Sequence, residues 1–286
     1  MKRNLLILFL LLTFHLSMNS QIVLKGELAK GLANIPELDY LDNGIIETIF
    51  EYILTDGVLN RTEIRTDILQ LGSNQSKYFK YATYQMDSVV YKQDIYNMSR
   101  QEFTNIFNKY QMSPGSSFML VKNYSEKSID FYERIFMDSY VYPDSVAFDW
   151  QLENDTLSVC GYLCRKARTS FRGRNWTAYY TDEIPVSDGP WKFSGLPGLI
   201  LKVEDTDKEH IFTAISIRNA NGDIYVEKKS SLFKTNREQF NKQLKEYMED
   251  PANIITGSQV APKNIDTGKE IPIPKRRRFF NPIELE

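Results

Sequence analysis

Short runs that mix β-branched, aromatic and polar residues recur along most of the chain and predict β-strands. They span residues 45–54, 62–72, 76–88, 117–124, 128–136, 157–171, 175–183, 199–205, 210–219 and 222–229. The run at 157–171 is interpreted as a hairpin, and the segment that carries Trp150 leads into it. Turn residues at Asp56-Gly57 and Gly72-Ser73-Asn74 separate the first runs, which is typical of an antiparallel meander.

Two segments follow helical spacing instead. In the first, Ser99 and Glu102 form a capping box, the apolar stripe Phe103, Ile106, Phe107 and Tyr110 follows, and Ser113-Pro114-Gly115 ends the helix. In the second, over 235–249, Thr235 and Glu238 form the capping box, and the apolar positions are Phe240, Leu244 and Tyr247. Both stripes predict helices with one face in the core.

The combined pattern predicts a mainly β protein. We expect a curved antiparallel sheet or half-barrel of about ten strands with two amphipathic helices. The aromatic content of 13%, with 17 Tyr and 17 Phe, favours strands in the same way. Residues 21–250 are expected to form a single domain, and the Pro-, Lys- and Arg-rich residues 251–286 an irregular tail.

The first 20 residues have the pattern of a secretory signal peptide. Lys2 and Arg3 precede an apolar run from Leu5 to Leu16, and Ser20–Gln21 is a cleavage point. A membrane anchor is the alternative, but the run is shorter than the roughly 20 residues that span a bilayer. We therefore expect export to the periplasm, to the cell surface or to the medium, with no transmembrane span after cleavage.

Charge excludes one class of partner and cysteine content predicts one covalent bond. The net charge of -2 gives no basis for nucleic-acid binding. Cys160 and Cys164 are the two cysteines, and a close pair in an exported chain predicts a disulfide. Two free thiols, or redox or metal chemistry, are the alternatives. No metal site and no cofactor are expected.

The stretch GPWKFSGLPGLIL, residues 189–201, is interpreted as a rigid double bend that leads into a strand. It lacks the Lys-Ser or Lys-Thr ending of a phosphate-binding loop. Pro197 and Gly198 suit a type II turn, in which glycine accepts a positive φ. The residues assigned to this structural motif are Gly189, Pro190, Gly195, Leu196, Pro197, Gly198, Leu199 and Ile200.

Other side chains are candidates for ligand binding. Trp191 and Phe193 supply a large apolar surface at the bend, Trp176 and Tyr180 lie on one face of a neighbouring strand, and Arg172 and Arg174 are able to bind an anionic group. The alternative for the two arginines is structural pairing with Asp182 or Glu204. The basic tail KRRRFF, residues 275–280, is either a membrane contact or a solvated tail.

Catalytic candidates are fewer. His210, the single histidine after the signal, has no accompanying nucleophile motif. Asp182 and Glu183 precede the bend, while Glu204 and Asp205 end the strand after it. If these strands pair, the acids are placed to act together in glycoside cleavage or in calcium binding. Solvated acids at strand ends are the simpler alternative.

The hexapeptide GLPGLI at 195–200 resembles the name-giving motif of the GLPGLI family. The similarity includes WQLENDTLSVCGYLCRKA and FRGRNWTAYYTDEIPVSDGPWKF before it, LQLGSNQSKYF near the start and NPIELE at the close. The resemblance implies an exported protein of the Gram-negative envelope, and it carries over no catalytic residues. The matching positions are Gly161, Cys164, Lys166, Ala167, Phe171, Arg172, Gly173, Arg174, Ile184, Pro185, Gly189, Pro190, Trp191, Phe193 and Gly195 through Ile200.

The sequence therefore predicts an exported, non-enzymatic binding or assembly module for a lipid, a peptide or a glycan, with an envelope protein as a further possible partner. A hydrolase that uses the carboxylates around 182–205 is one alternative. A purely structural surface protein is the other.

Overall fold

The structure is a computed structural model that describes residues 37–92, 100–111, 118–228, 231–256, 261–263 and 267–286. The predicted signal peptide, the cap at Ser99 and the helix stop at Ser113-Pro114-Gly115 lie outside these residues. The fold class is confirmed, because most of the described chain forms one curved, mainly antiparallel sheet of 12 strands. None of the described helices is both long and apolar enough to cross a membrane.

The large sheet follows the chain with few crossovers. Its order is β14-β7-β6-β5-β4-β3-β2-β12-β11-β10-β9-β8. Its strands are β2 (Ile46–Asp56), β3 (Arg61–Leu71), β4 (Gln75–Lys80), β5 (Met119–Asn123), β6 (Ser128–Ile135), β7 (Asp138–Asp144), β8 (Gln151–Val159), β9 (Tyr162–Phe171), β10 (Arg174–Thr181), β11 (Leu199–Asp205), β12 (His210–Asn219) and β14 (Phe233–Lys234). Strands β1 (Leu38–Asp42) and β13 (Ile224–Glu227) pair separately.

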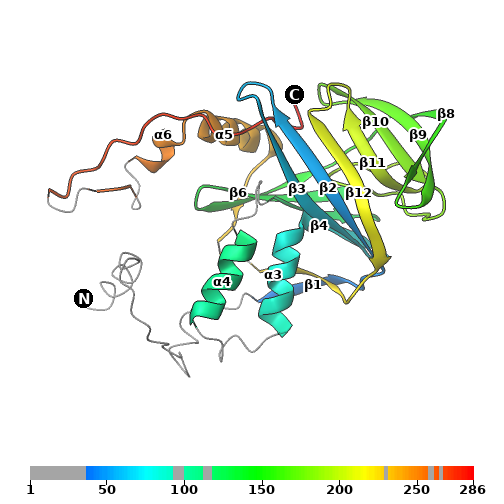
Figure 1. Ribbon diagram of the computed structural model, residues 1–286, viewed down its shortest axis with the longest axis horizontal. Coiled ribbons are helices and arrows are strands. Elements are labelled where there is room, and N and C mark those ends of the chain that lie inside the picture. Colours follow the sequence, from blue (N-terminus) through cyan, green and yellow to red (C-terminus); the bar gives the residue numbers. More distant parts are fainter. Residues whose placement is uncertain (1–36, 93–99, 112–117, 229–230, 257–260, 264–266) are drawn as a thin grey trace.

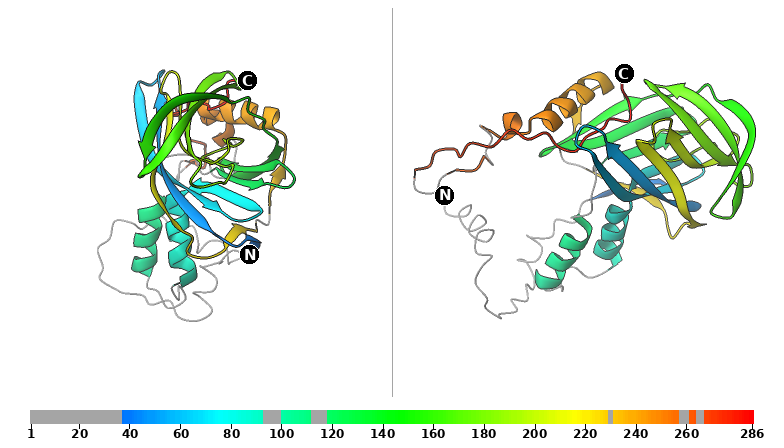
Figure 2. Two further views of the ribbon diagram at one scale, coloured as in Figure 1. Left: turned by 90° about the vertical axis from the view of Figure 1, so that its right-hand side faces the viewer. Right: turned by 45° about the horizontal axis from the view of Figure 1, so that its top comes forward.

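The sheet curves strongly but stays open, because its end strands β14 and β8 are not hydrogen-bonded to each other. Figure 2 (left) shows the curve from one end, with chain segments inside it. Alternate residues of β10 confirm the predicted faces: Trp176, Ala178 and Tyr180 are buried, while Asn175 is exposed. The concave side therefore holds the main aromatic core.

The run 76–88, predicted as one strand, is a strand followed by a helix. Strand β4 ends at Lys80, and α3 (Tyr81–Lys92) begins at once. Tyr81 and Tyr84, one helical turn apart, stack with ring centroids 5.7 Å apart and cover the outer-face cluster of Ile49, Ile68 and Phe79. Aromatic residues at both spacings concealed the boundary, because the alternation of β4 merges into the helical stripe.

The two predicted helices are present as α4 (Arg100–Gln111) and α5 (Arg237–Glu249), and α6 (Ala252–Ile255) follows. Helix α5 buries the predicted residues Phe240, Leu244 and Tyr247. Its N-cap, however, is Asn236 rather than Thr235, and the Asn236 side chain accepts a hydrogen bond from the backbone nitrogen of Gln239. Asn236, the residue after Thr235, caps the helix instead, because asparagine is a preferred N-cap residue.

In the described residues after 250, the chain is mostly irregular apart from α6, and part of it returns to the sheet. Arg277 donates two hydrogen bonds to Asp56, at 3.0 and 2.9 Å. Phe280 and Ile283 pack against the main core. The basic stretch 275–280 is therefore not simply solvated, because one of its arginines and one of its phenylalanines hold the chain end against β2.

Candidate functional site

The chain between β10 and β11, residues 182–198, folds into the concave side of the sheet; we call it the inner segment. Trp191 and Phe193 project from it into the core, where they are 3% and 0% exposed. The Phe193 ring lies 4.8 Å from the Trp176 ring, measured between centroids. These side chains, nominated as ligand contacts by the sequence, fill the interior themselves.

The bend at 195–200 differs from the predicted type II turn. That turn requires a positive φ at Gly198, but the positive φ values between residues 189 and 201 belong to Trp191 (51°) and Gly195 (90°). Gly198 is required for a steric reason instead. A Cβ atom there would lie 2.1 Å from the carbonyl oxygen of Thr181. Only glycine therefore allows the end of the inner segment to pass this close to the end of β10.

A buried carboxylate fixes the start of the bend. Asp188 is 0% exposed and forms an ion pair with Lys122 of β5. It also accepts hydrogen bonds from the hydroxyls of Ser76, at 2.5 Å, and Tyr124, at 2.9 Å. Burial lowers the pKa of Lys122, and the charge of Asp188 opposes that shift. Polar contacts thus attach the inner segment to β4 and β5.

A second buried ion pair fixes the tip of the inner segment. Lys192 is 0% exposed, and its Nζ lies 2.7 Å from Asp144 and 2.5 Å from Glu284. Burial alone would raise the pKa of Asp144, but hydrogen bonds from Arg172 and Lys192 lower it to about 2. Asp144 therefore stays ionised at neutral pH and pairs with Lys192 inside the fold.

Arg172 and Arg174 have internal partners, but not the predicted ones. Arg172 binds Asp144 in a bidentate pair at 2.8 and 2.7 Å. Arg174 lies 2.8 Å from Asp205 and 2.9 Å from Glu209. The predicted partners lie elsewhere, because Asp182 pairs with Arg165 and Glu204 pairs with Lys202. Both guanidinium groups are therefore paired with acidic side chains of the same chain.

The single described histidine is buried and uncharged. The hydroxyl of Tyr52 lies 2.8 Å from His210 Nδ1. Burial, and then the charge of Arg174, lower the pKa of His210 to about 3. His210 is 0% exposed, so a solute does not reach it in the folded protein.

The register of β10 and β11 separates the candidate carboxylates. These strands pair antiparallel, with Trp176 opposite Asp205 and Thr181 opposite Leu199. Asp182 and Asp205 therefore lie at opposite ends of the ladder, roughly 20 Å apart at about 3.3 Å per residue. Carboxylates that cleave glycosides together lie within about 10 Å of each other. The expected approach of the acids around the bend does not occur.

Cys160 and Cys164 are free thiols in the structure, which differs from the expected disulfide. The hairpin between β8 and β9 turns through Cys160 and Gly161, both with positive φ. Strand register places Leu157, not Cys160, opposite Cys164. Cys164 faces the core, and the Sγ of Cys160 lies 2.9 Å from the carbonyl oxygen of Ala214.

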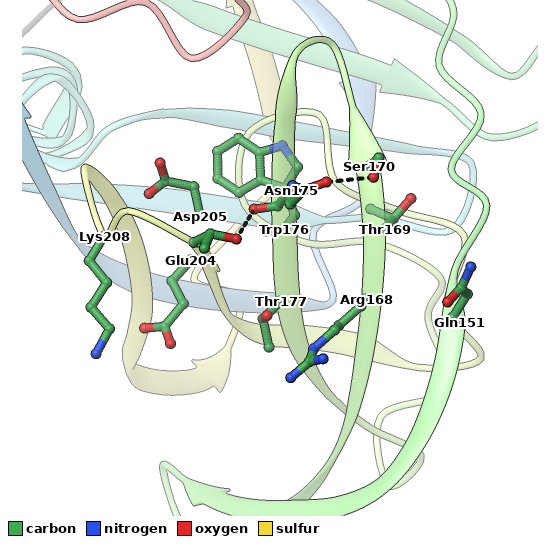
Figure 3. Close-up of a pocket in the computed structure, with 11 residues that line it drawn as sticks. Gln151, Arg168, Thr169, Ser170, Asn175, Trp176, Thr177, Glu204, Asp205 and Lys208 are labelled. Carbon is green, nitrogen blue, oxygen red and sulfur yellow. Dashed lines mark hydrogen bonds between the residues drawn. The ribbon is translucent and has the colours of Figure 1, made fainter.

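The described surface has a pocket on the other face of β9, β10 and β11, which we call the outer pocket (Figure 3). Its volume is about 530 Å³. Its lining residues are Gln151, Arg168, Thr169, Ser170, Asn175, Trp176, Thr177, Glu204, Asp205, Thr206 and Lys208. Figure 3 shows Glu204, Thr177 and Arg168 side by side on one side of the strands.

The outer pocket offers many hydrogen-bonding groups and little charge. The carboxylate of Glu204 is paired with Lys202 at 3.0 Å, and the Arg168 guanidinium is paired with Glu153 at 3.2 Å. The hydroxyl of Ser170 lies 2.6 Å from the side-chain oxygen of Asn175. Two of the charged side chains in the lining are therefore paired with neighbours, and the lining also contains hydroxyl and amide groups.

Sequence reasoning missed the outer pocket because it followed the aromatic face. Asn175 and Thr177 alternate with Trp176 and Ala178, so the polar face of β10 was visible as a pattern. Nothing in the local sequence indicated that Gln151 and Lys208, from two other parts of the chain, close the pocket. Among the described residues, no three His, Cys, Asp or Glu side chains are grouped so as to hold a metal ion.

Comparison with known proteins gives a local family match. Residues 172–202 match the model of a protein family described as "Protein of unknown function (Porph_ging)". This stretch contains β10, the inner segment and the start of β11. A search of curated proteins found no match.

The fold is similar to parts of solved structures of PNGF-II. Two crystal forms of that protein each match with a TM-score of 0.47 and 11% sequence identity over 70% of this chain. The match covers 33% of one PNGF-II chain and 32% of the other, so this chain spans about a third of their length.

Proposed function

We propose that this protein is an exported, non-enzymatic binding module of the bacterial cell envelope, of the GLPGLI family, and that it binds a glycan in the outer pocket. The composition of that pocket carries the proposal. Carboxylate, guanidinium, amide and hydroxyl groups surround about 530 Å³ of open space, and together they donate and accept hydrogen bonds in many directions. Such a set suits the hydroxyl groups of a sugar.

Aromatic side chains of the protein itself fill the concave side of the sheet, and this also favours the outer pocket as the binding site. The sequence left a lipid, a peptide and a glycan open, and a lipid requires a large apolar space. Trp191, Phe193 and Phe240 occupy the interior of the sheet. The outer pocket is instead lined mainly by polar side chains, which favours a polar ligand.

The hydrolase alternative loses its geometric basis because of the strand register. The carboxylate of Asp205 accepts hydrogen bonds from Arg174 and from the backbone nitrogen of His210, at 2.8 Å each. Asp182 lies at the far end of the same ladder. A carboxylate pair of the kind that cleaves glycosides is therefore not formed by the acids that flank the inner segment.

Binding is tested by NMR titration of the labelled protein with a panel of oligosaccharides, and separately with a panel of hexapeptides. We expect oligosaccharides to shift the amide signals of Thr177 and Glu204. Glu204→Gln and Thr177→Val should weaken that binding at least tenfold without lowering the melting temperature. Glu51→Gln, on β2, is the matched control. Binding of peptides alone, or shifts elsewhere on the surface, would reject the proposal.

Export is tested separately. The full chain is expressed in a Gram-negative host, the cells are fractionated, and the N-terminus of the purified protein is sequenced. We expect an extracytoplasmic protein that begins at Gln21. An unprocessed cytosolic chain would reject export without affecting the binding test.

A further inference from the structure

Residues 281–286, with the sequence NPIELE, lie against the folded body without regular secondary structure. Their contacts come from distant parts of the chain: β2, the turn between β9 and β10, the inner segment and α5. Figure 1 shows this last stretch running from α5 across the end of the sheet. It is held in the manner of a bound peptide, by side-chain recognition and a main-chain hydrogen bond.

The side-chain amide of Asn281 forms hydrogen bonds through both its nitrogen and its oxygen. Its Nδ2 donates to the carbonyl oxygen of Thr55, at 2.8 Å, and to the carboxylate of Glu209, at 2.7 Å. Its Oδ1 accepts from Arg174, at 2.8 Å. An aspartate has no donor for the first two partners, so these contacts are specific for the amide.

The side chain of Glu284 is recognised by three cations. It is 7% exposed and accepts hydrogen bonds from Lys192, at 2.5 Å, from Arg172, at 2.6 Å, and from Arg237, at 2.9 Å. Asp144 balances only part of this positive charge. Without Glu284, the site would leave buried cations without enough compensating charge, which is costly in a protein interior.

The main chain adds direction and fit. The backbone nitrogen of Leu285 donates to the carbonyl oxygen of Arg172, at 3.0 Å, and Arg174 donates to the carbonyl oxygen of Pro282, at 3.0 Å. A Cβ atom on Gly173 would lie 2.8 Å from the Cβ of Leu285. The turn between β9 and β10 is thus shaped to let an extended chain pass closely.

We propose that these contacts form a binding site for an extended peptide with Asn and Glu three residues apart, and that residues 281–286 fill this site in cis. The ligand is a peptide of a partner protein that carries the same pattern. Charge complementarity at the Glu284 position and the amide contacts at the Asn281 position identify it. The site lies at the end of the sheet, beside the turn between β9 and β10. None of the residues that contact Asn281 or Glu284 lines the outer pocket.

The test uses the full chain with the double substitution Asn281→Ala and Glu284→Ala, which leaves every residue of the site in place. A fluorescent peptide of sequence NPIELE is titrated against the variant and against the wild-type chain. A tethered segment competes at an effective concentration in the millimolar range. The variant is therefore expected to bind the peptide about a hundredfold more tightly than the wild type does, and the peptide should raise the melting temperature of the variant.

A control peptide with alanine in place of Asn and Glu should not bind either chain. A folded variant that takes up no NPIELE peptide would overturn the proposal. So would a variant that forms dimers without taking up peptide, because the site would then serve a second copy of the chain.

Wild-type protein gives a second test if the variant does not fold. An exchangeable segment must open without global unfolding. The backbone amide of Leu285 is therefore expected to exchange its hydrogen for deuterium at least tenfold faster than the amides of β10. Equal protection of Leu285 and β10 would show that residues 281–286 leave only when the protein unfolds, and this would overturn the proposal.

Discussion

Lys122 and Asp188 form an ion pair inside the curved sheet, with side chains only 5% and 0% exposed. They are 66 residues apart in sequence and join β5 to the inner segment. Replacing Asp188 by Asn leaves the Lys122 ammonium without a counter-charge in the interior. Because breaking a buried pair in this way costs about 3–5 kcal/mol, we expect Asp188→Asn to lower the free energy of unfolding by that amount in urea titrations.

A surface pair provides the control for this substitution. Glu63 pairs with Arg61, whose side chain is 60% exposed. Exposed pairs contribute about 1 kcal/mol or less, so Glu63→Gln should be almost neutral. If Asp188→Asn and Glu63→Gln unfold at the same urea concentration, the buried pair does not hold the inner segment.

Gly198 gives a test of the bend itself. An alanine Cβ would lie 2.1 Å from the carbonyl oxygen of Thr181, so β10 and β11 would have to separate at that point. We expect Gly198→Ala to reduce the free energy of unfolding by more than about 2 kcal/mol, as overpacking does in other interiors. Gly57→Ala is the control, since its Cβ meets only Glu209 at 3.7 Å. Equal melting temperatures for the two variants would contradict the steric role.

The two cysteines are expected to differ in reactivity. Cys164 is buried, and burial raises the pKa of its thiol to about 11. Cys160 is exposed at the hairpin turn. Iodoacetamide at mildly alkaline pH should therefore add one group to the native protein, at Cys160, and two groups to the protein in urea. The measurement is peptide mass spectrometry. A protein that takes up no label until a reductant is added would instead contain the disulfide.

The sheet could be predicted because its signal is local. Alternation in β10 records which face is buried, and the apolar stripe of α5 does the same for a helix. The boundary between β4 and α3 could not be predicted, since Tyr81 and Tyr84 of the helix continue the aromatic run of Tyr78 and Phe79 in the strand without a turn residue between them. The cap of α5 was misplaced by one residue for a similar reason, because Thr235 and Asn236 are both good capping residues.

The polar interior could not be predicted from local patterns. Lys192 and Glu284 are 92 residues apart, and nothing in the sequence near either residue indicates that the two charges pair. The sequence named Arg172 and Arg174 as candidates for ligand binding, with structural pairing as the alternative. It named the wrong acids as their partners, because the antiparallel register that brings Asp205 to Arg174 follows from the whole ladder and not from proximity in sequence.

Burial of His210 makes stability depend on pH. The pKa of its imidazole is lowered from 6.5 to about 3 by burial and by the charge of Arg174. The unfolded chain therefore binds a proton that the folded chain excludes between these two values. The stability that this contributes is complete above about pH 6.5 and is lost as the pH falls towards 3. A difference of one bound proton between the unfolded and the folded chain changes the free energy of unfolding by about 1.4 kcal/mol for each pH unit.

The effect of His210 is separated from that of the many acidic groups by a difference measurement. The free energy of unfolding of the wild type and of His210→Gln is determined by urea titration at several pH values from 7 to 4. The substituted glutamine cannot be protonated in this range, and the other groups cancel between the two chains. The wild type is expected to lose stability faster than the variant below about pH 6, by about 1.4 kcal/mol per unit. Parallel curves would mean that His210 has the same pKa in the folded and in the unfolded chain, and this would contradict the effect of its burial.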